Sequence, residues 1–285
     1  MASINSIIKT FKSELRHIYP NNEIQAFIEI LLAYYTGLSK TDLIIKTDET
    51  VDSAVCQQIE SSIVRLKNME PVQYIIGETE FYDLKIKVNP AVLIPRPETE
   101  ELVHWLINNH KKDKKTRVLD IGTGSGCIPL ALKNNLPDAE IFALDVSKKA
   151  LEIAKKNAKI NKLDISFVQL DILNAKNNNN LGMFDIIVSN PPYVRGQEKT
   201  LMHKNVLDNE PHLALFVKNN EALVFYEAII GFAKHHMHKK GCLYFEINEA
   251  YGKQMIELFE KNNYKNIELK QDINGKDRMI RAMKY

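Results

Sequence analysis

The chain has 285 residues, of which 45% are hydrophobic and 26% are charged. This ordinary globular balance allows one large domain or two smaller ones, with cores that need no disulfide or metal staples. The formal net charge is only +2, and acids and bases are mixed along the chain, which excludes an argument from bulk charge for a nucleic-acid partner.

The three cysteines, Cys56, Cys127 and Cys242, are far apart and have no metal-ligand spacing. They predict free thiols in a reducing compartment. Acidic residues interrupt the N-terminal segment, so we expect no signal peptide, and no run of about 20 apolar residues is present to span a membrane. The expected protein is a cytoplasmic monomer with no membrane, nucleic-acid or metal partner.

Apolar residues recur at helical spacing through the N-terminal part of the chain. The stripes cover residues 4–18, 24–35 and 51–66, and Ser39 with Asp42 resembles the capping box of a short helix. Pro71 ends the last stripe. The sequence therefore predicts a small helical domain over residues 1–71.

A different pattern follows, rich in β-branched and aromatic residues from Val72 to Val88, with Gly77 in the middle. It predicts a hairpin or short strand pair. The next stretch, "NPAVLIPRPETE", contains three prolines and predicts a stiff connection. We expect a β-hairpin linker over residues 72–97. Polar loops are expected at 111–115 and 177–180.

The third predicted domain, residues 98–285, begins with a helix from about Glu98 to Asn109 and then alternates strands with helices. This alternation is typical of a mostly parallel sheet covered by helices on both faces, and two final strands in succession predict an antiparallel edge. The expected strands are residues 117–121, 140–145, 165–171, 184–190, 241–247, 266–273 and 278–284, and the helices between them begin near 126, 147, 221 and 250.

A glycine-rich turn follows the first of these strands in "VLDIGTGSGCI". Gly122, Gly124 and Gly126 permit positive φ and close approach of a ligand to the backbone. Asp145 ends the next strand, where a carboxylate can accept both hydroxyls of a ribose. The pair fits either a nicotinamide dinucleotide or S-adenosylmethionine.

Two further acids favour S-adenosylmethionine. Asp120, just before the glycines, would repel a pyrophosphate but would receive the methionine ammonium, directly or through water. Asp171 closes the third strand and could accept from the adenine amino group, with Ile172 packing on the ring. The alternative for Asp171 is an ordinary helix N-cap.

The fourth strand leads directly into "NPPY", residues Asn190, Pro191, Pro192 and Tyr193. A planar NH₂ group is a poor nucleophile because its lone pair is delocalised, so its two N–H groups need acceptors while the nitrogen is aimed. The side-chain oxygen of Asn190 and the carbonyl of Pro191 would be those acceptors, and the prolines would hold the carbonyl still. Tyr193 would lie against the flat face of the substrate. The alternative is a plain turn after a strand.

"DIGTGSG" together with "NPPY" resembles the class I S-adenosylmethionine-dependent methyltransferases that modify amide or exocyclic amino nitrogens. The segments "PVQYIIGETEFYDLKIKVNPAVLIPRPETEELV", "NEPHLALF" and "DINGKDRMI" further resemble the peptide chain release factor glutamine methyltransferases, the PrmC/HemK family. The resemblance implies a Rossmann-like domain with a mostly parallel seven-stranded sheet. It also implies methyl transfer from S-adenosyl-L-methionine to the amide nitrogen of the glutamine in the Gly-Gly-Gln loop of release factors.

The resemblance also assigns residues to roles. The cofactor-binding residues would be Asp120, Gly122, Thr123, Gly124, Ser125, Gly126, Asp145, Asp171, Ile172 and Asn190. The glutamine would be held by Asn190, Pro191, Pro192 and Tyr193, and Arg96 and Glu98 would line the mouth of the site or simply pack the linker on the sheet. The helical domain would recognise the release factor. The chain departs from the family in having Asn248 where a glycine often follows "EI".

Several alternatives remain open. Methyltransferases acting on a glutamine of a ribosomal protein share the amide clamp, although their linker reads "PRSP" instead of "PRPETE". An adenine methyltransferase would bring a basic, aromatic-bearing surface domain, which the sequence lacks. Asp120 argues against an oxidoreductase, and a non-catalytic cofactor-binding module would not need Asn190. His235 and His238 would be helix neighbours in "HHMH", but no further ligand set accompanies them.

Overall fold

A computed structural model describes residues 1–110, 115–175, 181–218 and 221–285. The polar loops expected at 111–115 and 177–180 lie outside these ranges, except for Lys115. The chain forms two compact units. We call residues Met1–Gly77 with His203–Asn209 the helical unit, and Glu78–Met202 with Glu210–Tyr285 the catalytic unit.

The helical unit is built on one apolar core, in which Phe11, Leu15, Ile24, Leu31 and Leu66 are fully buried. The predicted capping box of Ser39 and Asp42 is present at the start of α3. The elements of the unit are β1 (Ala2–Ser3), α1 (Ile4–Leu15), α2 (Asn21–Thr36), α3 (Lys40–Ile45), β2 (Thr50–Val51), α4 (Ser53–Lys67), α5 (Val72–Ile76) and α9 (Lys204–Asn209).

The prediction of strand structure from Val72 onward was wrong for its first residues, which form helix α5. Pro71 precedes this helix with φ −57°, and Gly77 ends it with φ 73° and an N–H bond to the carbonyl of Gln73. Proline before and glycine after a short segment favour a helical turn, and here they outweigh the β-branched composition. The hairpin is shorter than expected and consists of β3 (Glu78–Phe81) and β4 (Leu84–Lys87).

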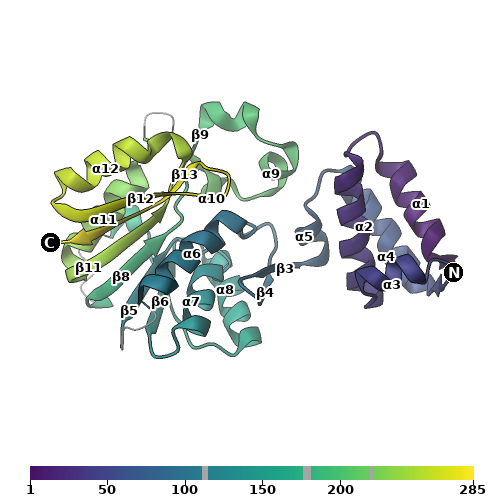
Figure 1. Cartoon of the computed structure of the whole chain (residues 1–285), viewed down its shortest axis with the longest axis horizontal. Coiled ribbons are helices and arrows are strands. Elements are labelled where there is room, and N and C mark those ends of the chain that lie inside the picture. Colours follow the sequence, from purple (N-terminus) through teal and green to yellow (C-terminus); the bar gives the residue numbers. More distant parts are fainter. Residues whose placement is uncertain (111–114, 176–180, 219–220) are drawn as a thin grey trace. The chain divides into compact units, whose positions relative to one another are not determined.

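The catalytic unit contains the expected mostly parallel sheet, with seven strands in the order β12-β13-β11-β8-β5-β6-β7 (Figure 1). Four neighbouring pairs are parallel, whereas β13 runs antiparallel to both β11 and β12, which confirms the predicted antiparallel edge. The strands are β5 (Arg117–Ile121), β6 (Glu140–Asp145), β7 (Ser166–Gln169), β8 (Phe184–Ser189), β11 (Met237–Glu246), β12 (Tyr264–Gln271) and β13 (Asp277–Lys284).

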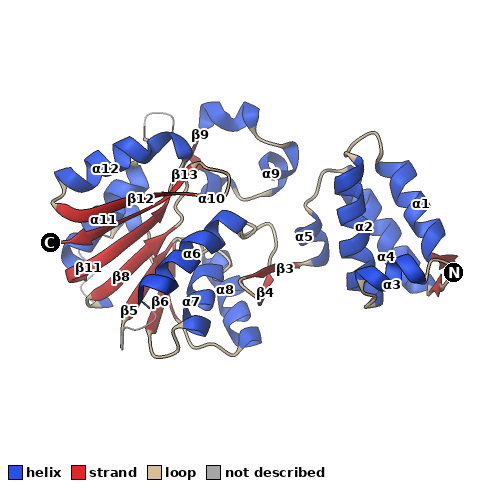
Figure 2. Cartoon of the chain, in the orientation of Figure 1, coloured by secondary structure: helices blue, strands red, loops and turns tan. Residues whose placement is uncertain are grey.

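Helices cover both faces of this sheet (Figure 2), as the alternating pattern predicts. The longer ones are α6 (Pro97–His110), α7 (Cys127–Asn135), α8 (Lys148–Asn161), α11 (Val224–His236) and α12 (Gly252–Lys261). The described part of this unit also contains short elements that were not predicted, because they are too short to show a period: η1 (Ile172–Asn174), β9 (Val194–Arg195), η3 (Gly196–Leu201), α10 (His212–Leu215), β10 (Phe216–Val217) and η4 (Glu249–Tyr251).

The prediction that His235 and His238 are neighbours on one helix was wrong. Helix α11 ends at His236 and β11 begins at Met237, so His235 and His238 are not helix neighbours. His236 stacks on Phe232 at 4.1 Å between ring centroids, and its Nδ1 lies 3.0 Å from the carbonyl of Gly182.

Over the described ranges, no helix is both long and apolar enough to cross a membrane.

Candidate functional site

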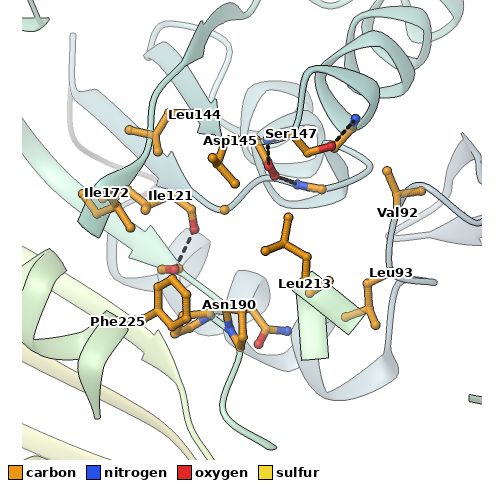
Figure 3. Close-up of a pocket in the computed structure, with 18 of the residues that line it drawn as sticks. Val92, Leu93, Ile121, Leu144, Asp145, Ser147, Ile172, Asn190, Leu213 and Phe225 are labelled. Atoms are coloured by element: carbon orange, nitrogen blue, oxygen red, sulfur yellow. Dashed lines mark hydrogen bonds between the residues drawn. The ribbon is translucent and has the colours of Figure 1, made fainter. Parts of the chain in front are cut away.

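A cavity of about 270 Å³ opens at the carboxyl ends of β5, β6 and β8. Ligands of open α/β sheets bind at this edge. In Figure 3, Asp145 and Ser147 lie on one side of the cavity, and Asn190 and Phe225 lie on the other. Residues from outside the strands complete the wall, namely Ala91, Val92 and Leu93 before α6, and Pro211, Leu213 and Ala214 around the start of α10.

The three glycines after β5 have different structural roles. Gly122 and Gly124 line the cavity, and the N–H of Gly124 donates to Oδ2 of Asp145 at 2.9 Å. Gly126 is not a wall residue among those described. It begins α7 with φ 82°, and a Cβ there would come within 3.0 Å of the Cβ of Ala154 in α8. Its place in the motif is therefore explained by helix packing.

Asp145 ends β6 and faces the cavity. Its two oxygens accept from the backbone N–H groups of Gly124 and Ser147, at 2.9 and 2.8 Å. Burial raises the pKa of Asp145, and these backbone donors oppose the rise. Because each carboxylate oxygen can accept more than one hydrogen bond, both oxygens keep capacity for ligand hydroxyls.

Asp120 lies beneath the glycine turn and is completely buried. Neither of its oxygens has a hydrogen-bond partner among the described residues. Burial raises the pKa of Asp120 to about 7, although the nearby Thr123 hydroxyl, which itself lacks a well-formed hydrogen bond, opposes the rise. Asp120, Thr123 and Ser125 are not wall residues within the described ranges, so Asp120 would act on a ligand through water or through the loop.

Asp171 has the helix N-cap role that the sequence offers as its alternative. Its oxygens accept from the N–H of Leu173 at 3.0 Å and from the side-chain amide of Asn174 at 2.7 Å, which caps η1. Both Asp171 and the buried Ile172 also line the cavity.

Asn248 stands where the family often has glycine, but this position does not need a glycine. Its φ is −67°, and its side chain caps η4 by accepting from the N–H of Ala250.

Asn190 follows β8 and lines the cavity together with Pro191 and Pro192. Its Nδ2 donates to the Thr99 hydroxyl at 3.1 Å. Tyr193 points elsewhere: its hydroxyl donates to Oε1 of Glu246 at 3.1 Å, and its ring is not part of the described wall. Thr99 and Glu246 were missed from the sequence, because no spacing rule connects an early helix with the end of a late strand.

Arg96 and Glu98 are not wall residues among those described. The guanidinium of Arg96 instead pairs with Glu210 at 2.5 Å, and the other oxygen of Glu210 accepts from the N–H of Ile94 at 3.3 Å. This buried carboxylate therefore ties the stretch before α6 to the stretch that contributes Pro211 and Leu213 to the cavity. Glu210 was also missed, although it lies in the quoted segment "NEPHLALF".

Comparisons with known proteins agree with this geometry. Residues 99–216 match the model of the methyltransferase small domain, and residues 6–77 match that of the PrmC N-terminal domain. A release factor glutamine methyltransferase of Flavobacterium psychrophilum is 48% identical over 97% of this chain and 99% of its own length. One of Bacteroides thetaiotaomicron is 42% identical over 98% and 99%. The chain belongs to the release factor glutamine methyltransferase family.

A solved structure of a methyltransferase from Pyrococcus furiosus has the same fold, with a TM-score of 0.52 at 17% identity over 82% of this chain and 99% of that one. Membership of the release factor glutamine methyltransferase family makes S-adenosyl-L-methionine the cofactor. The residues present fit it. Asp145 offers acceptors to a ribose. Asp120, whose carboxylate has no hydrogen-bond partner among the residues that the structure describes, supplies negative charge for a ligand that carries an ammonium and a sulfonium.

Proposed function

We propose that this protein transfers a methyl group from S-adenosyl-L-methionine to the side-chain amide nitrogen of the glutamine in the Gly-Gly-Gln loop of peptide chain release factors. One observation carries the proposal. Asn190 lines the same cavity as Asp145 and has its Nδ2 engaged by Thr99, so its Oδ1 remains to accept from a carboxamide. The full-length similarity to relatives of that name gives the substrate.

S-adenosylmethionine supplies an electrophilic methyl group on a sulfonium, and the chain supplies binding and alignment. Asn190 Oδ1 and the carbonyl of Pro191 accept the two N–H groups of the glutamine and hold its nitrogen in line. The aligned nitrogen would take the methyl carbon, the cofactor would leave as the neutral thioether S-adenosylhomocysteine, and the amide proton would pass to solvent after transfer. Alignment of this kind is worth about 7–11 kcal/mol of the barrier. No histidine or cysteine is required.

The function is tested by a labelled methyl-transfer assay with a purified release factor as acceptor. We expect label on the wild-type factor and none on a factor whose loop glutamine is replaced by alanine. A ribosomal protein and nucleic acid are offered as competing acceptors. Label that persists on the alanine factor, or that passes preferentially to either competitor, would overturn the assignment in favour of one of the alternatives.

We further propose that the chain is organised as a substrate-recognition domain (1–71), a hairpin linker (72–97) and a methyltransferase domain (98–285). The helical unit exposes large apolar side chains without an evident role in its own core. Ile44 and Ile45, in α3, are 72% and 74% exposed. Such neighbouring apolar side chains are suited to contact a folded protein surface.

The expected effect of Ile44→Ser with Ile45→Ser is a KM for the intact release factor raised by about tenfold or more, since burial of even one aliphatic side chain contributes about 1.5–3 kcal/mol. The KM for a short Gly-Gly-Gln peptide should not change, because a peptide reaches only the cavity. Ile160→Ser is the matched control, since Ile160 in α8 is an exposed aliphatic residue of the catalytic unit. Equal effects on protein and peptide would count against a recognition role for α3.

A further inference from the structure

A buried hydrogen-bonded series runs from Glu246 to the cavity. The Thr99 hydroxyl donates to Oε2 of Glu246 at 2.6 Å and accepts from Nδ2 of Asn190 at 3.1 Å. Glu246 ends β11 and is 2% exposed, and Thr99 in α6 is 3% exposed. Both residues are outside the cavity wall, and all three members belong to the catalytic unit.

While Glu246 is ionised, the donors and acceptors of this series can be arranged in only one way. An ionised carboxylate can only accept, so the single proton of the Thr99 hydroxyl is committed to Glu246. The hydroxyl can then only accept from Asn190, which must offer it NH₂ and not oxygen. We propose that Glu246, acting through Thr99, is a positioning residue that fixes the side-chain amide of Asn190 with its oxygen toward the substrate carboxamide. The proposal rests on the proposed function, because only an NH₂-bearing substrate needs that oxygen.

The surroundings of Glu246 hold it for this role. Its other oxygen accepts from Tyr193 at 3.1 Å, and its backbone carbonyl accepts from the Tyr226 hydroxyl at 3.0 Å. The carbonyl of the next residue, Ile247, accepts from the guanidinium of Arg278 at 3.3 Å, and that guanidinium is paired with Asp272 at 3.2 Å.

This support explains the segment "DINGKDRMI", residues 272–280. Within the part of the chain that the structure describes, none of its residues lines the cavity. Asp272 accepts from the N–H groups of Asn274 and Lys276 and so shapes the turn that delivers Arg278. The positive charge of Arg278 favours the ionised form of Glu246. The segment thus acts on the site through the carboxylate of Glu246.

The charge on Glu246 decides which group donates each hydrogen bond of the series. Burial raises the pKa of Glu246, the hydrogen bonds from Thr99 and Tyr193 and the charge of Arg278 lower it, and the charge of Glu98 raises it. The other titratable neighbours are Tyr226, through its bond to the backbone, and Cys127. A protonated Glu246 could donate to Thr99, which would free the hydroxyl to donate to the oxygen of Asn190. Turnover should therefore be lost as the pH falls through the raised pKa of Glu246.

The test compares Thr99→Val, which removes the hydroxyl with little change of shape, with Thr99→Ser, which keeps it. We expect kcat with the release factor to fall about 10- to 100-fold in Thr99→Val, the range produced by small misplacements at a reacting centre, and to stay near wild type in Thr99→Ser. The acid limb of the pH–rate profile should disappear with Thr99→Val and remain with Thr99→Ser. The Kd for S-adenosylmethionine should change little in either variant.

A second readout does not use methyl transfer. The side-chain NH₂ signals of Asn190 can be assigned in ¹⁵N-labelled full-length protein by their loss in Asn190→Asp. One proton should be shifted downfield by its bond to Thr99 in wild type and in Thr99→Ser, but not in Thr99→Val. Unchanged signals in Thr99→Val, or equal losses of kcat in both Thr99 variants, would overturn the proposal. Failure of the wild-type protein to methylate any release factor would instead overturn the proposed function, and the NMR comparison would still decide the orientation.

Discussion

Replacing Asn190 with alanine is expected to lower kcat for the release factor by about 10³-fold, the upper end of the range seen when one preorganised hydrogen-bonding group of an active site is removed. The variant loses an acceptor that the reacting nitrogen needs, and the remaining carbonyl of Pro191 cannot orient an NH₂ group alone. The affinity for S-adenosylmethionine should fall much less, because Asp145 and the glycine turn are untouched. Single-turnover methyl transfer and calorimetric titration of the cofactor measure the two effects separately.

The matched control is Asn108→Ala, which removes an exposed asparagine from α6, the helix that carries Thr99. It should behave as wild type. Asn190→Asp is also informative, because a carboxylate keeps an acceptor but cannot donate to Thr99, and it should be nearly as inactive as alanine. Full activity in Asn190→Ala would remove the amide clamp from the mechanism.

The alternating pattern of residues 116–284 was sufficient to predict the sheet, because buried parallel strands are short apolar runs that helices separate in the sequence. The antiparallel edge followed from two strands with no helix between them. Residues 72–76 misled, because Val72, Tyr74, Ile75 and Ile76 have strand-forming composition, whereas the fold is set there by Pro71 and Gly77. Composition is a weaker guide than terminating residues in a segment of five.

The candidate site was predictable where its residues share a local motif. The glycine turn, Asp145 and Asn190 could each be placed at a strand end from sequence alone, and the structure brings them to one cavity. Tyr193 and Arg96 were predicted to face the substrate, but in the structure Tyr193 donates to Glu246 and Arg96 pairs with Glu210. These partners are distant in sequence, and the bond from Thr99 to Glu246 spans 147 positions. Such pairs depend on the strand order, which a single sequence does not specify.

Replacing Asp120 with asparagine should have opposite effects on the free protein and on cofactor binding. Burial raises the pKa of Asp120 from 3.8 to about 7, which corresponds to about 4 kcal/mol of unfavourable free energy when the group is fully ionised. Because the folded state holds this proton more tightly than the unfolded state, the contribution lowers stability progressively as the pH rises from about 4 to about 7. The unliganded variant should therefore be more stable than wild type at pH 8, and this advantage should shrink at pH 5.

The negative charge of Asp120 should in turn favour binding of the cationic cofactor. An ionised Asp120 attracts the ammonium of S-adenosylmethionine, so wild-type affinity should rise with pH through about 7, whereas the Asp120→Asn variant should bind about tenfold or more weakly at pH 8 and lose this pH dependence. Denaturation at pH 5 and pH 8, with and without cofactor, measures both effects. Asp164→Asn, which changes an exposed acid of the catalytic unit, controls for charge alone. A buried, unpartnered carboxylate is tolerated in the free protein because the ligand completes its environment, and this explanation fails if Asp120→Asn binds the cofactor as tightly as wild type at pH 8.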